Sequence, residues 1–209
     1  MSNKNEQKAV KRPYILKARA RRRDQVHSRI TKAAVKLHES IGPAKTTMNA
    51  IAELAGVRRA TVYNHFPTEL ELIDACSSHW MSQNPPPDLN AWAEIDDPVA
   101  RARQALADMY AYFDGNQQML GNVLRDAAVV PAMDEIRHQK WQPMINGIAD
   151  LLVDGWQSSG KLDVSAESRI RATARVALDF FAWQNLSSSG LSTRNAAALA
   201  AGWIEASAR

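Results

Sequence analysis

The apolar positions of the chain recur at intervals of three and four residues from about residue 24 onward, the spacing of one helix face. A first helix is marked in this way by Val26, Ile30, Ala33, Ala34, Leu37 and Ile41. Gly42 and Pro43 end this helix, because glycine suits the position after a helix and proline cannot continue one.

Residues 47–66 predict two further helices, both very short and separated by a tight turn. Thr47 is the expected N-cap of the first, whose buried side is formed by Ile51, Leu54 and Ala55. Gly56 ends it, and residues 58–66 form the second. Two helices this short cannot fold alone, so they need the helices on either side.

Longer amphipathic segments follow a run of three prolines at residues 85–87, which interrupts any helix. Their apolar spacing predicts helices over residues 99–113, 119–127, 131–156, 167–186 and 193–207. Pro143 predicts a kink or break near residues 139–142 of the third. No segment alternates with period two, so the sequence predicts an all-α protein.

Four regions are expected from these boundaries. They are a disordered basic tail (1–23), a helix-turn-helix domain (24–68), a connecting helix (69–84) and a C-terminal domain (85–209). The C-terminal domain is expected to be a larger helical bundle that binds a ligand and dimerises.

Charge is distributed unevenly along the chain. Residues 1–66 hold 15 Lys and Arg against 4 Asp and Glu, a net charge of +11, whereas residues 67–209 hold 11 against 18, a net charge of −7. Such an asymmetry indicates a nucleic-acid or anionic partner for the basic part. A merely solvated basic tail is the alternative explanation.

Several classes of protein are disfavoured. A single cysteine allows no disulfide framework and no cysteine-based metal site. The basic N-terminus lacks the apolar stretch of a secretory signal, and no apolar run is long enough to span a bilayer, so a cytoplasmic protein without a membrane partner is expected. The histidines and serines show no zinc-binding, nucleophile-elbow or phosphate-loop pattern, so we expect no enzyme, no metal and no cofactor.

Two short helices joined by a glycine-containing turn match the helix-turn-helix motif, in which the second helix enters the major groove of DNA. Ala52 is small enough for close helix crossing, and Gly56 allows the positive φ of the turn. The expected outward-facing residues are Arg58, Arg59, Thr61, Tyr63, Asn64 and His65. A generic helical hairpin with a polar surface is the competing interpretation.

Roughly residues 28–75 resemble the DNA-binding domain of the tetracycline-repressor (TetR) family. The resemblance is carried by Ala34, Gly42, Thr46, Thr47, Ile51, Ala52, Ala55, Gly56, Val57, Thr61, Val62, Tyr63, His65, Phe66 and Leu72. It implies a bacterial-type transcription regulator: a homodimeric repressor that binds an operator in double-stranded DNA and is released by a small molecule. The final two helical segments look like the family's closing helix pair, which implies a homodimer through them.

The resemblance also implies roles for individual residues. Thr47 would cap its helix and touch a phosphate, and Asn49 would project toward the groove. Thr61, Tyr63 and His65 would hold phosphates, which fix register but carry no sequence information. Arg59 is the expected base reader, favouring guanine.

The chain departs from the family pattern at Arg58, which replaces a frequent capping serine, and at Glu69, which replaces a frequent lysine next to DNA. Ala60 also replaces a frequent glycine. The lysine anchor is absent, so we expect the basic tail to supply the missing positive charge toward phosphates or the minor groove.

Aromatic and methionine side chains of the C-terminal domain could line a pocket for a small apolar or aromatic ligand. The candidates are Tyr112, Phe113, Trp141, Met144, Trp156, Phe180 and Trp183. Packed core is the alternative for each of them. The matching functional alternative is a DNA-binding regulator whose C-terminal domain only dimerises or binds a protein. An apolar cavity of about 300 Å³ or more would favour ligand release, and a solid core would favour the alternative.

Overall fold

The computed structural model describes the backbone of residues 4–158, 160 and 163–209, and within these ranges the side chains from Lys17 onward. The described residues form helices joined by turns and contain no strand, which confirms the all-α prediction. None of these helices is both long and apolar enough to cross a membrane.

The N-terminal domain is built on α1 (Lys4–Ile41), which packs against the short helices α2 (Met48–Ala55) and α3 (Arg59–His65) and against α4 (Glu69–Gln83). Its core contains Ile30, Ala34, Ile51, Val62, Phe66 and Leu72, all nearly inaccessible to solvent. A short 3-10 turn, η1 (Pro43–Lys45), joins α1 to α2. Each short helix is therefore held by the apolar faces of its longer neighbours.

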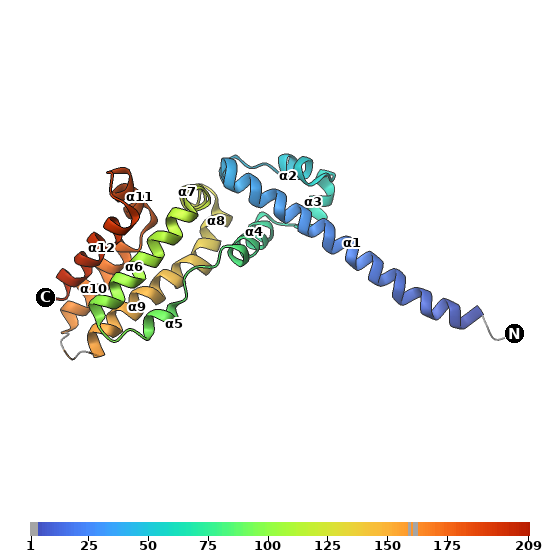
Figure 1. The fold of residues 1–209 in the computed structure, drawn as a ribbon. Coiled ribbons are helices and arrows are strands. Elements are labelled where there is room, and N and C mark those ends of the chain that lie inside the picture. Colours follow the sequence, from blue (N-terminus) through green and yellow to red (C-terminus); the bar gives the residue numbers. More distant parts are fainter. Residues whose placement is uncertain (1–3, 159, 161–162) are drawn as a thin grey trace.

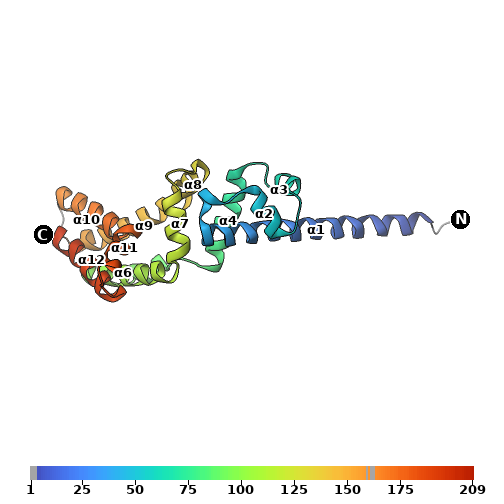
Figure 2. The ribbon, with the colours of Figure 1, turned by 90° about the horizontal axis from the view of Figure 1, so that it is seen from above.

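The C-terminal domain is a helical bundle that lies at the other end of an elongated molecule (Figures 1 and 2). Its elements are α5 (Leu89–Ala93), α6 (Pro98–Gly115), α7 (Gln117–Asp126), α8 (Pro131–Ile136), η2 (Arg137–Trp141), α9 (Gln142–Ser158), α10 (Val164–Ala177), α11 (Phe180–Ser188) and α12 (Thr193–Ser207). Helix α6 packs on α9 and most extensively on α12, and the core between them is rich in aromatic residues.

Composition predicts that residues 1–23 are a disordered basic tail, and the structure describes residues 4–23 as helix. They form the first half of α1, which continues past α2 and α3 as an unaccompanied helix (Figures 1 and 2). Lys, Arg and Ala favour helix, and the packed half of α1 provides a nucleus from which the helix can extend. Residues 1–3 of the predicted tail lie outside the described residues.

The predicted interruption before Pro143 is present as a π-helical turn, η2, between α8 and α9. Proline lacks the N–H that would bond to the preceding turn, and a widened turn accommodates its ring.

The single helix predicted over residues 167–186 is wrong. The chain breaks at Leu178 and Asp179, where the Asp179 carboxylate accepts a 2.9 Å hydrogen bond from the backbone N–H of Ala182 and starts α11. Apolar spacing continues through this break, so periodicity alone could not show it.

Candidate DNA-binding interface

The turn between α2 and α3 has the geometry that the sequence predicts. Gly56 adopts φ +64° and ψ +42°, in the left-handed region, and no atom lies close to the position of an added Cβ. The backbone N–H of Val57 donates to the carbonyl of Ala52 at 2.9 Å and closes the end of α2. Glycine is therefore favoured here by the backbone angle and not by lack of space.

The apolar side of helix α3 packs into the core of the N-terminal domain and holds the helix in place. Val62 is fully buried, and Phe66 follows one turn later in the same core. The ring of Phe66 also packs against His27 of α1, with ring centroids 4.5 Å apart. The remaining sides of α3 are left for polar contacts, as a helix that enters a groove requires.

Thr47 caps α2 as predicted. Its hydroxyl oxygen accepts a 3.1 Å hydrogen bond from the backbone N–H of Ala50, and the side chain is exposed. Asn49, in the first turn of the same helix, is also exposed. Both residues therefore lie on the open side of α2, near its N-terminal end.

Arg58 occupies the N-cap position of α3 without a side-chain capping bond. Its backbone is extended, at φ −79° and ψ +149°, and the side chain is exposed. The cap that a serine would supply is therefore missing, as expected, and the guanidinium is left available to another acceptor.

Arg59 and Tyr63 form a contact that was not predicted from the sequence. The Arg59 Nη2 donates to the Tyr63 hydroxyl at 3.1 Å, and the guanidinium carbon lies 5.4 Å from the centre of the phenol ring. The i,i+4 spacing of the two residues is a signal that could have identified it. The predicted base reader and a predicted phosphate contact thus act as one unit in this structure.

The other predicted residues of α3 differ in how exposed their side chains are. Asn64 is exposed and Thr61 is half-buried. His65 is half-buried against α1, and its Nδ1 is buried without a hydrogen-bond partner among the described residues. Burial lowers the pKa of His65, and the nearby His27 and Arg23 lower it further.

Glu69 stands exposed in the first turn of α4, where the sequence departs from the family pattern. The preceding Thr68 caps the helix: its hydroxyl accepts from the backbone N–H of Glu71 at 3.2 Å and donates to the Glu71 carboxylate at 3.1 Å. Carboxylates here favour the helix N-terminus, but they repel a phosphate.

The candidate pocket residues of the C-terminal domain mostly lie in a packed core. Phe113, Phe180 and Trp183 are buried, with ring centroids 5.3–5.8 Å apart. Tyr112 and Trp156 are buried in the same core, and Met144 packs against it. For this group the alternative interpretation, packed core, describes the arrangement.

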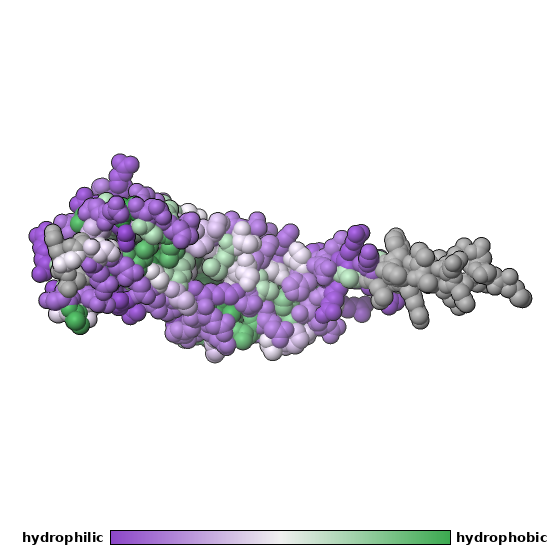
Figure 3. All heavy atoms as spheres, turned by 90° about the horizontal axis from the view of Figure 1, so that it is seen from below, coloured by the Kyte–Doolittle hydropathy of each residue, from purple (hydrophilic) through white to green (hydrophobic). Residues whose placement is uncertain are grey.

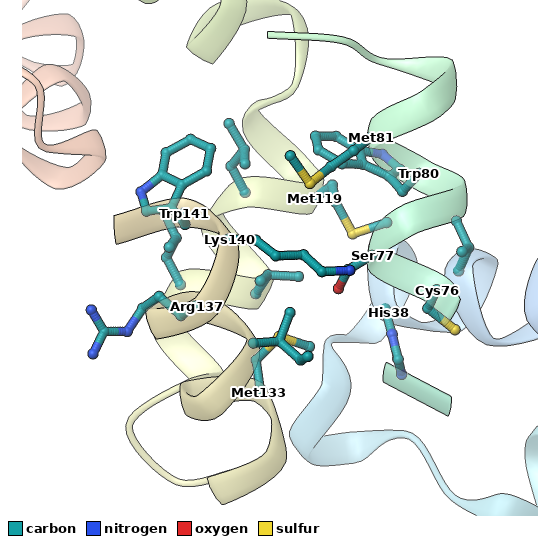
Figure 4. A pocket seen from close by; sticks show the side chains of 15 residues that line it. His38, Cys76, Ser77, Trp80, Met81, Met119, Met133, Arg137, Lys140 and Trp141 are labelled. Atoms are coloured by element: carbon teal, nitrogen blue, oxygen red, sulfur yellow. The ribbon is translucent and has the colours of Figure 1, made fainter. Parts of the chain in front are cut away.

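Trp141 is the member of that set that borders an apolar cavity of about 80 Å³ at the junction of the two domains (Figure 4). The walls come from α1, α4, α7, α8 and η2, and Figure 4 shows Trp80, Met81 and Met119 facing Trp141 across it. A second cleft of about 340 Å³, between α7, η2, α10 and α11, has both Trp141 and Phe180 in its wall.

The junction cavity contains two buried groups that can ionise. Burial lowers the pKa of His38 to about 4, although the neighbouring Asp126 opposes the shift. Burial raises the pKa of the Cys76 thiol to about 12. On the rim, Lys140 pairs with Asp74 at 2.6 Å and donates to the Ser78 hydroxyl at 2.7 Å. The described residues contain no cluster of His, Cys, Asp and Glu suited to a metal ion.

Comparison with known proteins agrees with this geometry. Residues 30–76 match the model of the bacterial regulatory proteins of the tetR family. No curated protein sequence matches the chain.

Solved structures with the same fold cover most of the chain. A Clostridium perfringens protein proposed to regulate fatty acid metabolism is 18% identical, with a TM-score of 0.62 over 85% of this chain and 97% of that one. A TetR transcription regulator from Haloarcula marismortui is 19% identical, with a TM-score of 0.61 over 88% and 97%. RolR in complex with resorcinol is 17% identical, with a TM-score of 0.54 over 90% and 89%.

The matched segment contains α2, the Gly56 turn and α3, and the solved regulators share the arrangement of the helices around it. Residues 30–76 are therefore similar to the matching segment of the bacterial regulatory proteins of the tetR family, and the described chain has the fold of solved regulators of that family.

Proposed function

We propose that the protein is a homodimeric repressor that a small apolar or aromatic molecule releases from its operator. The observation that carries this proposal is the position of the apolar cavity between the two domains. Its walls include α1 and α4, which also support α2 and α3, and α7, α8 and η2 of the C-terminal domain. A molecule bound there touches both domains at once.

The small volume of the cavity is part of the mechanism. About 80 Å³ is well below the roughly 300–1,000 Å³ of most ligand sites, so a ligand must separate α4 from α8 and η2 to enter. The ligand then binds the separated arrangement better than the closed one, which is the requirement for shifting a population. Because α4 packs against α1, its displacement also moves the recognition helix.

The resorcinol complex of RolR supports a single aromatic ring as the ligand class. In this chain Trp80 and Trp141 offer ring faces, and methionine, leucine, valine and isoleucine side chains supply most of the remaining apolar wall. The solid core around Phe113 supports the alternative, a C-terminal domain that only dimerises or binds a protein.

Resorcinol and related single-ring phenols are the first probes. A bound phenol should quench the fluorescence of Trp80 or Trp141, raise Tm and weaken binding to a duplex that the protein selects. Val123→Phe, which fills the cavity, should abolish all three effects and leave DNA binding intact. Val129→Phe, at a site that is 71% exposed, is the matched control. If no single-ring compound acts on the wild-type protein, the alternative is favoured.

A homodimer is supported by the outer face of α12. Ala198, Leu199, Gly202 and Ala206 are exposed at helical spacing, with no charged side chain among them. Figure 3 shows hydrophobic residues also gathered on one face of the C-terminal domain, whereas the N-terminal part is mostly hydrophilic. Small exposed residues let two helices approach closely.

Sedimentation tests the dimer. Leu199→Glu should convert the wild-type dimer into a monomer, because it places a charge in the centre of this face. Val164→Glu, at the exposed start of α10, should leave the dimer unchanged. A wild-type protein that sediments as a monomer contradicts the proposal.

A further inference from the structure

The N-terminal half of α1 presents positive charge that the remainder of the protein does not neutralise. Residues 17–23 contain Lys17, Arg19, Arg21, Arg22 and Arg23 and no carboxylate, and all five side chains are exposed. Among the described side chains, none of the five forms an ion pair. Five cations on two turns of helix repel one another, and a polyanion relieves that repulsion.

The register of α1 divides these cations between two faces. Arg19 and Arg23 are separated by four residues and continue, at helical spacing, into Val26 and Ile30. Val26 and Ile30 pack in the core with α2, α3 and α4. The face that carries Arg19 and Arg23 therefore points to the same side of α1 as the helix-turn-helix.

Lys17 and Arg21, also separated by four residues, lie on the opposite face. Their spacing continues into Gln25, Ser28 and Lys32, which are all exposed. This face points away from α2 and α3, and it provides a control of equal charge.

The first face leads directly to α3. Arg23 is followed one turn later by His27, whose ring lies 6.1 Å from that of His65 in an edge-to-face arrangement. His65 is itself a predicted phosphate contact. Helix α1 continues beyond the end of the recognition helix (Figure 2). The charged face therefore begins beside that end and runs on along α1.

We propose that the face of α1 that carries Arg19 and Arg23 binds the phosphates of the duplex that α3 enters. This inference rests on the proposed DNA-binding role and adds a second contact element to it. The sequence contains further positive charge toward the N-terminus, at Lys4, Lys8, Lys11 and Arg12. The element compensates for Glu69, a carboxylate at the position where a lysine would meet DNA.

Salt dependence separates a true phosphate contact from general attraction. Arg19→Ala/Arg23→Ala should reduce the slope of log K against log salt by about 1.8, since each lost phosphate contact changes it by about 0.9. Lys17→Ala/Arg21→Ala should keep the wild-type slope. Alanine favours helix, so equal far-UV circular dichroism verifies that both variants retain α1.

The slopes are measured with full-length protein between about 50 and 200 mM salt. One probe is the duplex that the wild-type protein recovers from a randomised pool, and the other is the unselected pool. Equal losses in both variants would assign the effect to net charge and overturn the assigned face. Unchanged slopes in both would overturn the DNA contact and favour another anionic partner, such as a lipid surface.

Failure of this inference is distinguishable from failure of the proposed function. A wild-type protein that recovers no sequence from the pool contradicts sequence-specific regulation. The unselected pool then still measures whether Arg19 and Arg23 contact phosphate. A protein that selects a sequence but shows no change in slope contradicts the role of α1 alone.

Discussion

Asp126, the last residue of α7, accepts a 2.9 Å hydrogen bond from the backbone N–H of Ala44 in the turn between α1 and α2. Its other carboxylate oxygen accepts from Arg125 at 2.7 Å. One turn earlier, the Asn122 amide donates to the carbonyls of His38 and Glu39 at the end of α1. Helix α7 therefore holds the N-terminal domain through polar contacts at the edge of the apolar cavity.

Asp126→Ala should weaken this junction. It removes a part-buried hydrogen bond to a charged acceptor, which costs about 1.5–3 kcal/mol. Urea unfolding at neutral pH measures the loss. Asp134→Ala is the matched control, because Asp134 also pairs with an arginine but is far more exposed. Equal effects of the two substitutions would show that the Ala44 contact contributes nothing.

Gly42→Ala should destabilise the protein more than Gly56→Ala. Both glycines have positive φ, but a Cβ at Gly42 would clash with the Asp126 carboxylate, whereas nothing lies near one at Gly56. An alanine at Gly56 bears the cost of the left-handed conformation, about 1–2 kcal/mol. An alanine at Gly42 must adopt φ +89° and ψ +156°, a region essentially restricted to glycine that costs about 1–3 kcal/mol, and must in addition displace Asp126. Urea unfolding of both variants tests this order, and an equal or smaller loss for Gly42→Ala would contradict it.

Stability should fall as the pH drops from 6.5 toward 4. The unfolded chain binds a proton on His38 near pH 6.5, whereas the folded protein binds it near pH 4. The contribution of His38 is therefore complete above pH 6.5 and is lost as the pH falls through about 4, with a magnitude of about 3 kcal/mol.

Urea unfolding as a function of pH tests this assignment. His38→Leu, which keeps the cavity wall apolar, should remove most of the loss between about pH 6.5 and pH 4. His138→Leu, which removes an exposed imidazole on η2, should retain it. A His38 variant with the wild-type pH dependence would show that another group is responsible.

Arg59 and Tyr63 should be energetically coupled in DNA binding. Arg59→Ala should cost about 1–3 kcal/mol and relax specificity at one position of each half-site. Because the Tyr63 hydroxyl holds the guanidinium, Tyr63→Phe should relax specificity at that same position. A double-mutant cycle on the selected duplex should show non-additive losses, whereas Arg58→Ala and Tyr63→Phe should be additive. Additive losses for Arg59 and Tyr63 would show that the two residues act independently in DNA binding.

Local signals predict the helices and the DNA-binding motif well. Gly56, the Thr47 cap and proline at the start of α8 act through the backbone of their own turn, and the structure contains each of them. The break at Asp179 was missed because the apolar spacing continues unchanged through it. The capping bond that starts a new helix there leaves no trace in that spacing.

Contacts between distant residues are not visible in the sequence. Ala44 and Asp126 are separated by 82 positions, and neither has an unusual neighbour that would connect them. Trp141 borders a cavity, whereas Phe113, Phe180 and Trp183 lie in a packed core. This difference depends on how α7, η2 and α11 meet. All of these residues have the same apolar helical spacing, so spacing cannot separate pocket from core.

The central claim is that α3 reads a specific DNA sequence in the context of a symmetric dimer. The most direct test is selection of binding sites from a randomised duplex pool by the wild-type protein and by Arg59→Ala. The account predicts that the wild-type protein recovers a two-fold-symmetric sequence, and that Arg59→Ala loses the preference at one position in each half. Recovery of no sequence by the wild-type protein, or of the same sequence with undiminished preference by Arg59→Ala, would contradict it.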